Sequence, residues 1–316
     1  MHTPRIGTEI PGPSEAFTII DFLGNGAFGE VYRAAGKASG KIVAVKLLPI
    51  GSLEDESSKA ALLNEIKTAL QIVHPNVVQV LDFSDQNLDL GPYLVMEYVS
   101  GGNLARLIKT QRAAATLIPL PRVREMMIDI AQGSRAINQK LIHRDIKPDN
   151  VLIEGTALKI GDFGISKFVD ESTRSKTFKG GQHVAYMAPE GWEGITNTVK
   201  IDTYSVGILF YQITSLVHPF EKTTGNSNDW RIWEKAHLFE PCPDVRTVRS
   251  EVDIATAQLI QRMAAKRPQE RPDWDEVLRV LTTPQPTVIA AANQPITAAV
   301  EAALKKRQEQ EKAALE

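Results

Sequence analysis

Apolar and polar positions follow two different periods along the chain. Between residues 17 and 50, short apolar blocks (FTIIDFL, EVYRAA and KIVAVKLL) are separated by glycine-containing turns, which predicts β-strands. Residues 55–73 change to the i, i+3, i+4 spacing of an amphipathic helix. The apolar face of that helix would comprise Leu62, Leu63, Ile66, Ala69, Leu70 and Val73. The blocks NVVQVLDF and YLVMEYV then return to the strand pattern.

Helical spacing dominates after residue 99. It predicts a core helix within 120–141 and later helices over 199–216, 253–265 and 274–281. A β-rich block with one helix therefore precedes a helix-rich block, and this α+β arrangement predicts two lobes with a cleft between them. The domains expected are a flexible Pro/Gly arm at 1–15, a first lobe at 16–98, a second lobe at 99–282, and a linker with a C-terminal helix at 283–316.

Composition narrows the classes of function. The net charge is −2, from 36 basic and 38 acidic residues, so nothing indicates binding to nucleic acid. No apolar run is long enough for a membrane span, and the N-terminus lacks the apolar core of a secretory signal. The single cysteine, Cys242, excludes an intramolecular disulfide and fits a reducing compartment. These observations predict a cytoplasmic protein. The mixed charges of 296–316 fit either a solvated terminal helix or a helix that binds a partner.

The stretch LGNGAFGEVYRA carries Gly24, Gly26 and Gly29. Glycines at this spacing let backbone N–H groups approach phosphates closely. A dinucleotide site would need a helix next, whereas EVYRAA is β-branched and aromatic. A glycine hairpin laid over the phosphates of a nucleotide fits better.

Lys46 lies among apolar residues in the block IVAVKLL. One interpretation is a lysine at a strand edge that extends to water. The other is a buried ammonium group that needs an anionic partner, for which phosphate oxygens or Glu65 on the next helix would serve.

The segments HRDIKPDN and IGDFG together offer the groups that phosphoryl transfer requires. Asp162 and Asn150 provide hard oxygen ligands for Mg²⁺, Asp145 suits a base, and Lys147 suits the γ-phosphate. Each residue taken singly has a simpler interpretation as a loop cap or a surface charge.

Glycine loop, VAVK, HRDIKPDN, DFG and APE occur in the order of the protein-kinase signature. Over about residues 17–281 the chain resembles a eukaryotic-type (Hanks-type) serine/threonine protein kinase. The resemblance implies a two-lobed fold with ATP in the cleft, accompanied by Mg²⁺ or Mn²⁺. It also implies that Glu65 pairs with Lys46 in the active state. The residues expected around adenine are Val31, Ala44 and Leu152 on its two faces, Met96 as the gatekeeper, and Glu97 and Val99 through their backbone groups.

Two further roles follow from the resemblance. Asp202 would anchor the catalytic loop, and Arg271 would pair with Glu190 of APE. Lys147 in DIKPDN is typical of serine/threonine kinases, and the intact DFG and APE segments favour a protein substrate.

The activation segment would run from 162 to 190. Arg144 would contact a phosphate on this segment, with Ser175 or Thr177 as the expected regulatory site, although these hydroxyls also fit an unregulated solvated loop. His183 occupies the position where such kinases usually carry threonine. An imidazole could imitate the hydrogen bonds of that hydroxyl, or the alignment could shift at the neighbouring glycines.

The main hypothesis is an active kinase of unknown protein substrate that phosphorylates its own activation segment. One alternative is a catalytically weak kinase-like scaffold that binds nucleotide and partners, which only His183 favours. Another is a small-molecule kinase, which the APE segment disfavours.

Overall fold

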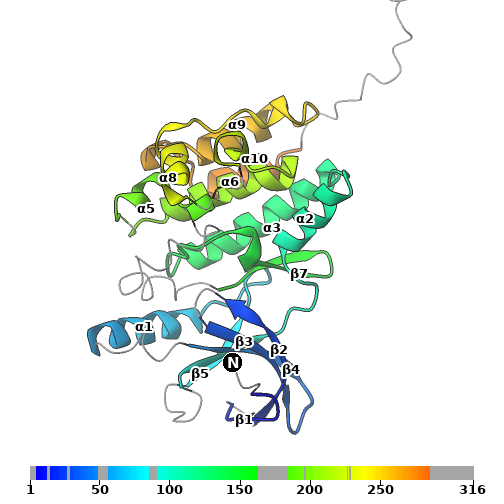
Figure 1. Cartoon of the computed structure of the whole chain (residues 1–316), viewed down its shortest axis with the longest axis vertical. Coiled ribbons are helices and arrows are strands. Elements are labelled where there is room, and N and C mark those ends of the chain that lie inside the picture. Colours follow the sequence, from blue (N-terminus) through cyan, green and yellow to red (C-terminus); the bar gives the residue numbers. More distant parts are fainter. Residues whose placement is uncertain are drawn as a thin grey trace, which may run out of the picture. The chain divides into compact units, whose positions relative to one another are not determined.

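The computed structural model describes residues 5–12, 15–26, 29–48, 56–84, 91–162, 184–195, 197–225, 227 and 229–284. The chain divides into two units, Met1–Thr282 and Thr283–Glu316. The description below concerns the first unit (Figure 1). The predicted C-terminal helix lies outside the described residues.

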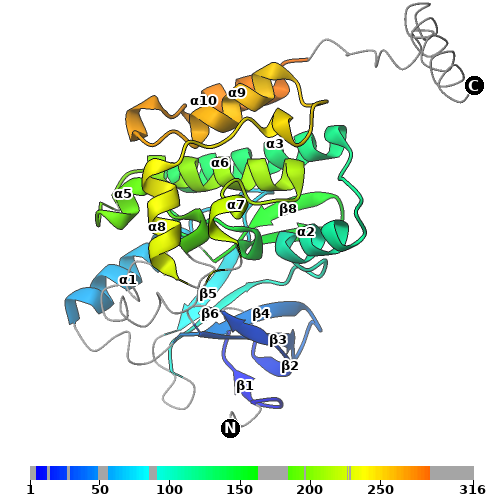
Figure 2. The ribbon, with the colours of Figure 1, turned by 45° about the horizontal axis from the view of Figure 1, so that its top comes forward.

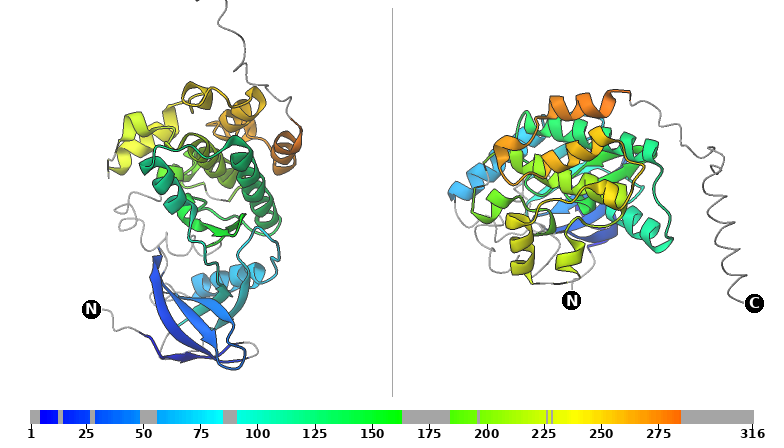
Figure 3. Two further views of the ribbon diagram at one scale, coloured as in Figure 1. Left: turned by 90° about the vertical axis from the view of Figure 1, so that its right-hand side faces the viewer. Right: turned by 90° about the horizontal axis from the view of Figure 1, so that it is seen from above.

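A six-stranded antiparallel sheet forms the first lobe of the described chain (Figures 1 and 3). Its spatial order is β1-β2-β3-β4-β6-β5. The strands are β1 (Glu9–Ile10), β2 (Phe17–Gly26), β3 (Gly29–Gly36), β4 (Ile42–Leu47), β5 (Val80–Ser84) and β6 (Tyr93–Glu97). The turn-separated apolar blocks of the sequence thus correspond to strands.

The first strand corrects the prediction of a flexible arm at 1–15. Residues 5–12 lie along β2, with backbone hydrogen bonds from Gly7 N to Ile19 O (2.8 Å) and from Ile19 N to Thr8 O (2.9 Å). Ile10 is fully buried in a cluster on one face of the sheet. Pro and Gly mark turns in this segment, but two residues are enough to pair with a sheet edge when one of them fills a core position.

Helix α1 (Glu56–Ala69) follows β4 and ends earlier than predicted. Val73 was expected on its apolar face, but it lies beyond the helix and is 73% exposed. Pro75 explains the difference, because a proline disfavours helical backbone in the residue before it and breaks a helix that runs through it.

The second lobe is mainly helical (Figure 2). Its longer helices are α2 (Leu104–Ala113), α3 (Leu120–Asn138), α6 (Lys200–Ser215), α8 (Trp230–Phe239), α9 (Ile254–Met263) and α10 (Trp274–Thr282). Helix α6 is buried along almost its whole length and packs against α3 and α9. The short helices are α5 (Pro189–Trp192) and α7 (Glu221–Thr224).

Short strands and turns near the first lobe carry the chemistry. Strands β7 (Val151–Glu154) and β8 (Ala157–Ile160) form a hairpin, preceded by the 3₁₀ turn η2 (Pro148–Asn150). One buried apolar cluster includes residues of both lobes, among them Ala44, Leu62, Ile130 and Leu158. The predicted two-lobed α+β architecture is confirmed.

Candidate active site

Strand β4 places Lys46 inside the molecule. Its side chain is 0% exposed, opposite Val31 of β3 and Leu94 of β6. Lys46 Nζ lies 2.8 Å from Asp162 Oδ1, which directly follows the β8 hairpin. A lysine at this depth needs an anion nearby. The interpretation of Lys46 as a lysine that extends to water is therefore wrong.

The loop before β7 gathers three predicted residues around one carboxylate oxygen. Asp145 Oδ2 accepts hydrogen bonds from Lys147 Nζ and from Asn150 Nδ2, each at 3.0 Å. Asn150 Nδ2 also donates to the backbone carbonyl of Asp145 at 2.7 Å. Because both bonds use the amide nitrogen, the side-chain oxygen of Asn150 is the atom left to bind a cation.

A buried carboxylate from α6 holds this loop. Asp202 Oδ2 accepts from the backbone N–H of His143 at 2.8 Å and from Asn138 Nδ2 at 2.6 Å. Asp202 Oδ1 accepts from the backbone N–H of Arg144 at 2.8 Å. The prediction that Asp202 anchors the loop is confirmed, since its carboxylate accepts hydrogen bonds from donors that all belong to the loop or to α3.

His143 connects the loop to the segment that carries Asp162. Its Nδ1 accepts from the backbone N–H of Asp145 at 3.2 Å, so Nε2 carries the proton and donates to Gly161 O at 2.9 Å. Arg144 and Asp162 both adopt left-handed backbone, with φ of 66° and 59°. Such conformations cost energy in residues other than glycine and persist where the surroundings enforce them.

Glu65 makes a different contact from the one expected for the active state. Its Oε1 lies 3.2 Å from Arg144 Nη1, whereas Lys46 pairs with Asp162. Helix α1 is therefore tied to the catalytic loop in this structure. Asp202 holds the backbone of Arg144, and Arg144 Nη1 also donates to Ile142 O at 3.3 Å, next to its contact with Glu65.

The residues expected around adenine lie in or against the apolar cluster shared by the two lobes. Ala44, Met96 and Val99 are buried members of it, and Val31 and Leu152 pack against it. The backbone N–H of Glu97 donates to Gln79 O at 3.0 Å, so its carbonyl is the group that remains for a nucleotide.

The side chain of Glu97 was not assigned a role from sequence. Its carboxylate accepts from Gln79 N at 2.8 Å and from Lys159 Nζ at 2.8 and 2.9 Å. Burial lowers the pKa of Lys159, but its bonds to Glu97 and Glu154 outweigh burial and raise the pKa overall. Glu97 thus joins β6 to β8, a contact that no local pattern signals.

Gly29 must be glycine for a reason of packing. Its φ is +130°, and a Cβ atom there would lie 1.8 Å from the carbonyl oxygen of Leu47. Gly24 and Gly26 end strand β2, in the position expected for a loop over phosphates.

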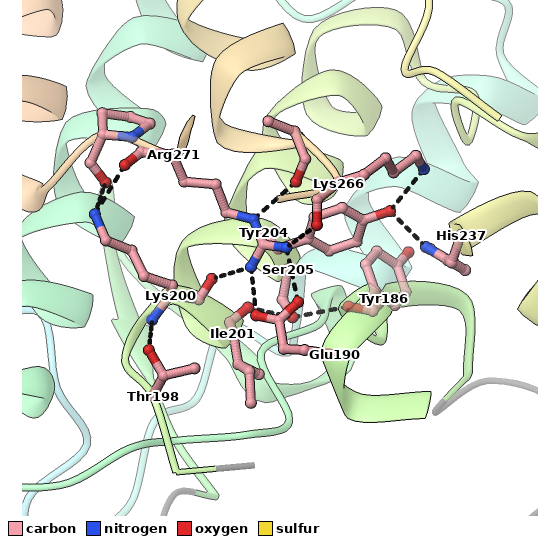
Figure 4. A network of polar contacts seen from close by, with 12 residues as sticks. Tyr186, Glu190, Thr198, Lys200, Ile201, Tyr204, Ser205, His237, Lys266 and Arg271 are labelled. Carbon is pink, nitrogen blue, oxygen red and sulfur yellow. Dashed lines mark hydrogen bonds and ion pairs between the residues drawn. The ribbon is translucent and has the colours of Figure 1, made fainter. Parts of the chain in front are cut away.

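A second ion pair joins APE to the end of the second lobe (Figure 4). Arg271 Nη1 and Nη2 lie 2.6 and 2.7 Å from the two carboxylate oxygens of Glu190, and the prediction of this pair is confirmed. The same guanidinium donates to the carbonyls of Lys200, Ala265 and Lys266.

These contacts permit a test of whether Mg²⁺ suits the site. Asp162 and Asn150 offer one carboxylate and one amide oxygen, and the described residues contain no group of three or more His, Cys, Asp or Glu that could hold a metal alone. Mg²⁺ fits such a sparse donor set, because it typically takes one or two protein ligands plus water and substrate phosphates. Ser175, Thr177 and His183 lie outside the described residues.

Comparison with protein families decides the identity of the fold. Residues 17–281 match the family model described as "Protein kinase domain". The chain belongs to the protein kinase family.

Curated relatives of this kinase domain include a "Probable serine/threonine-protein kinase nek2" of Dictyostelium discoideum. It is 30% identical over 271 residues, which cover 84% of this chain and 62% of the relative. The "DNA damage-responsive serine/threonine-protein kinase RqkA" of Deinococcus radiodurans is 32% identical over 84% of this chain and 38% of its own length. The "Serine/threonine-protein kinase pkn3" of Myxococcus xanthus is 31% identical over 83% and 48%. The kinase domain therefore spans less than two thirds of each of these proteins.

The resemblance to Hanks-type serine/threonine kinases, bacterial ones included, is thus confirmed. In the described part of the kinase domain, no helix combines the length and the apolar character that crossing a membrane requires.

Proposed function

We propose that this kinase domain transfers the γ-phosphoryl group of ATP to serine or threonine hydroxyls of proteins. The observation that carries the proposal is the convergence of Lys147 and Asn150 on the carboxylate of Asp145, with Lys46 paired to Asp162 nearby in the fold. Phosphoryl transfer depends on positioning and charge rather than on covalent chemistry by the protein.

Each residue has a role that its contacts support. Asp145 would orient the attacking hydroxyl and accept its proton, and Lys147 would neutralise charge on the group being transferred. Lys46 would hold the α- and β-phosphates, and Asn150 and Asp162 would hold Mg²⁺, which when bound neutralises charge on the phosphates. Val31, Ala44, Met96, Glu97, Val99 and Leu152 would hold adenine.

We also propose that the domain phosphorylates its own activation segment, at Ser175 or Thr177. Arg144 supports this regulation, since its guanidinium group pairs with Glu65 and a phosphate would compete for it. The protein substrate, a cytoplasmic location and a partner for the C-terminal helix remain predictions.

Incubation with labelled ATP and Mg²⁺, with and without a generic protein substrate, tests the proposal. Label should appear on protein serine or threonine and disappear in Asp145→Asn, which keeps size and hydrogen bonding but removes the base. Mass spectrometry should locate autophosphorylation at residues 175 or 177. Nucleotide binding without transfer would instead identify a scaffold, and label found only on metabolites would identify a small-molecule kinase.

A further inference from the structure

The 3₁₀ turn η4 (Val184–Tyr186) lies directly before APE and packs into the second lobe. Val184 and Ala185 share a buried apolar cluster with Trp233 of α8. Ser205 of α6 donates to the carbonyl of Tyr186 at 2.8 Å. The turn belongs to the described end of the segment, residues 184–190, that under the proposed function presents the hydroxyl of a protein substrate to Asp145.

His218 makes a further polar contact to this turn, in addition to the hydrogen bond from the Tyr186 hydroxyl to Gln212 Oε1. Its Nε2 lies 2.8 Å from the carbonyl oxygen of Ala185, and its Nδ1 accepts the backbone N–H of Phe220 at 3.2 Å. Because Nδ1 is an acceptor, the ring is neutral and Nε2 is the donor. The imidazole is 8% exposed and is surrounded by the rings of Tyr186, Phe220, Trp233 and His237.

A second buried imidazole stands behind the first. His237 on α8 is 0% exposed, and its Nδ1 is 2.8 Å from the hydroxyl of Tyr204 (Figure 4). Lys266 Nζ is 3.4 Å from the same hydroxyl, and an ammonium can only donate, so the Tyr204 proton is free to point to His237. His237 Nε2 has no hydrogen-bond partner among the described residues.

The hydrogen bond from His218 holds one backbone oxygen of the turn, the Ala185 carbonyl. A carbonyl has two lone pairs, of which His218 uses one. The apolar contacts of Val184 and Ala185 are non-directional, whereas the bond to His218 fixes the orientation of the peptide plane.

We propose that His218, whose ring packs against His237, is a positioning residue for the protein substrate, which it serves by holding the Ala185 carbonyl. The proposal rests on the proposed kinase function. It assigns to His218 an effect on the KM for protein and none on the binding of ATP, whose expected contacts are in β3, β4, β6 and β7.

Three substitutions at one position separate the two hydrogen bonds of the ring. His218→Phe keeps an aromatic ring and loses both bonds. His218→Gln places an amide N–H near the position of Nε2 and restores the bond to Ala185, and His218→Asn places its amide near Nδ1 and restores only the bond from Phe220. Tyr93→Phe is the control, because it removes a partly buried side-chain bond to a carbonyl (Tyr93 Oη to Pro11 O, 3.0 Å) and the contact of the same hydroxyl with Ser84, in the first lobe and not in the turn.

The measurements are the KM for a protein substrate, the KM for ATP, and hydrogen–deuterium exchange of residues 184–188. A lost hydrogen bond of this kind predicts an increase of about fivefold in the KM for protein in His218→Phe, with the KM for ATP unchanged. In His218→Gln the KM for protein should return toward the parent value. In His218→Asn it should stay as high as in His218→Phe. Tyr93→Phe should leave the KM for protein unchanged. Exchange at 184–188 should rise and fall in parallel with the KM for protein.

Equal effects in all three His218 variants, an effect in Tyr93→Phe, or no effect in His218→Phe would overturn the proposal. If the parent domain transfers no phosphate, the proposed function fails, and the exchange measurement still decides whether His218 holds the turn.

Discussion

Two buried cations of this kinase domain, Lys46 and Arg271, each contact a carboxylate at 2.6–2.8 Å, yet their surroundings differ. Arg271 meets Glu190 with two parallel bonds and three backbone carbonyls, and both side chains are 5% exposed or less. The partner of Lys46 is Asp162, which is 26% exposed and has left-handed backbone. The first pair is closed on every side by protein, and the second has a carboxylate open to other molecules.

The difference in exposure indicates that the Arg271–Glu190 pair maintains the fold, whereas the Lys46–Asp162 pair belongs to the candidate active site. A closed pair with complete hydrogen bonding resists exchange, because either charge left alone would be buried without a partner. A pair with an open carboxylate can exchange partners as nucleotide and metal enter. Substitutions can therefore test the comparison, since one pair should affect stability and the other should affect transfer.

Removal of Arg271 should give the largest effect on stability. Arg271→Met leaves Glu190 buried and opens three carbonyls, so the free energy of unfolding should fall by about 3–5 kcal/mol. Chemical denaturation measures this change. Arg135→Met is the control, because its pair with Asp275 is 43% and 77% exposed and should contribute less than about 1 kcal/mol. A small loss in Arg271→Met would show that the pair is not what holds APE to the second lobe.

Removal of Lys46 should affect the rate of phosphoryl transfer much more than the stability of the fold. Lys46→Met keeps an unbranched chain in the cluster and leaves Asp162 in contact with water, so the free energy of unfolding should change by no more than about 1–2 kcal/mol. The rate of phosphoryl transfer should fall by roughly 10²–10³-fold, as expected when the charged group that positions the α- and β-phosphates is lost. Melting and transfer assays on the same preparation check both parts, and a variant that unfolds would contradict the distinction drawn here.

Acid should weaken the second lobe through His218. Burial lowers the pKa of this imidazole from 6.5 to about 4, although the Ala185 carbonyl and Glu221 act in the opposite direction. Burial and the charge of Lys266 also lower the pKa of His237. A pKa that is lower in the folded state means that the unfolded chain binds protons first as the pH falls. The contribution to stability is thus fully present above pH 6.5 and is lost as the pH approaches 4.

The loss expected from His218 is on the order of 3 kcal/mol by pH 4. Denaturation of the parent and of His218→Phe between pH 7 and about 4 measures it. The stability of the variant should depend less steeply on pH, because one titrating group is gone. Equal slopes would show that His218 does not remain neutral in the folded domain.

Residues with a strong local signal could be predicted from the sequence. Lys46, Asp145 and Asp162 belong to short sequence motifs, and these motifs predict the chemical role of each residue before the fold is known. Helices α6 and α9 are predicted by the spacing of apolar residues. Other features depend on contacts distant in sequence. Ile10 is buried only because a sheet edge is available to it, and His218 has a role only because α8 and η4 enclose it.

The partner of Glu65 shows why such contacts escape a motif. Lys46 and Arg144 are both cations within reach of α1, and the sequence alone does not rank them. Which of the two cations pairs with Glu65 depends on how Asp202 holds the loop and on the position of Asp162. Both are tertiary contacts between residues distant in sequence.

Glu65→Gln should give the smallest effect on the rate of transfer. It tests directly whether the open Lys46–Asp162 pair exchanges partners during transfer. If Glu65 leaves Arg144 and joins Lys46 during transfer, loss of its charge should lower the rate about tenfold, the equivalent of one charge-assisted hydrogen bond. The free energy of unfolding should change by about 1 kcal/mol, because the Arg144 and Glu65 side chains are only 13% and 19% exposed but one hydrogen bond survives in the amide. Glu154→Gln, which alters an exposed partner of Lys159, is the control and should leave the rate unchanged. A normal rate in Glu65→Gln would mean that Lys46 does not exchange Asp162 for Glu65 during transfer. The open pair would then exchange partners with ligands but not with α1.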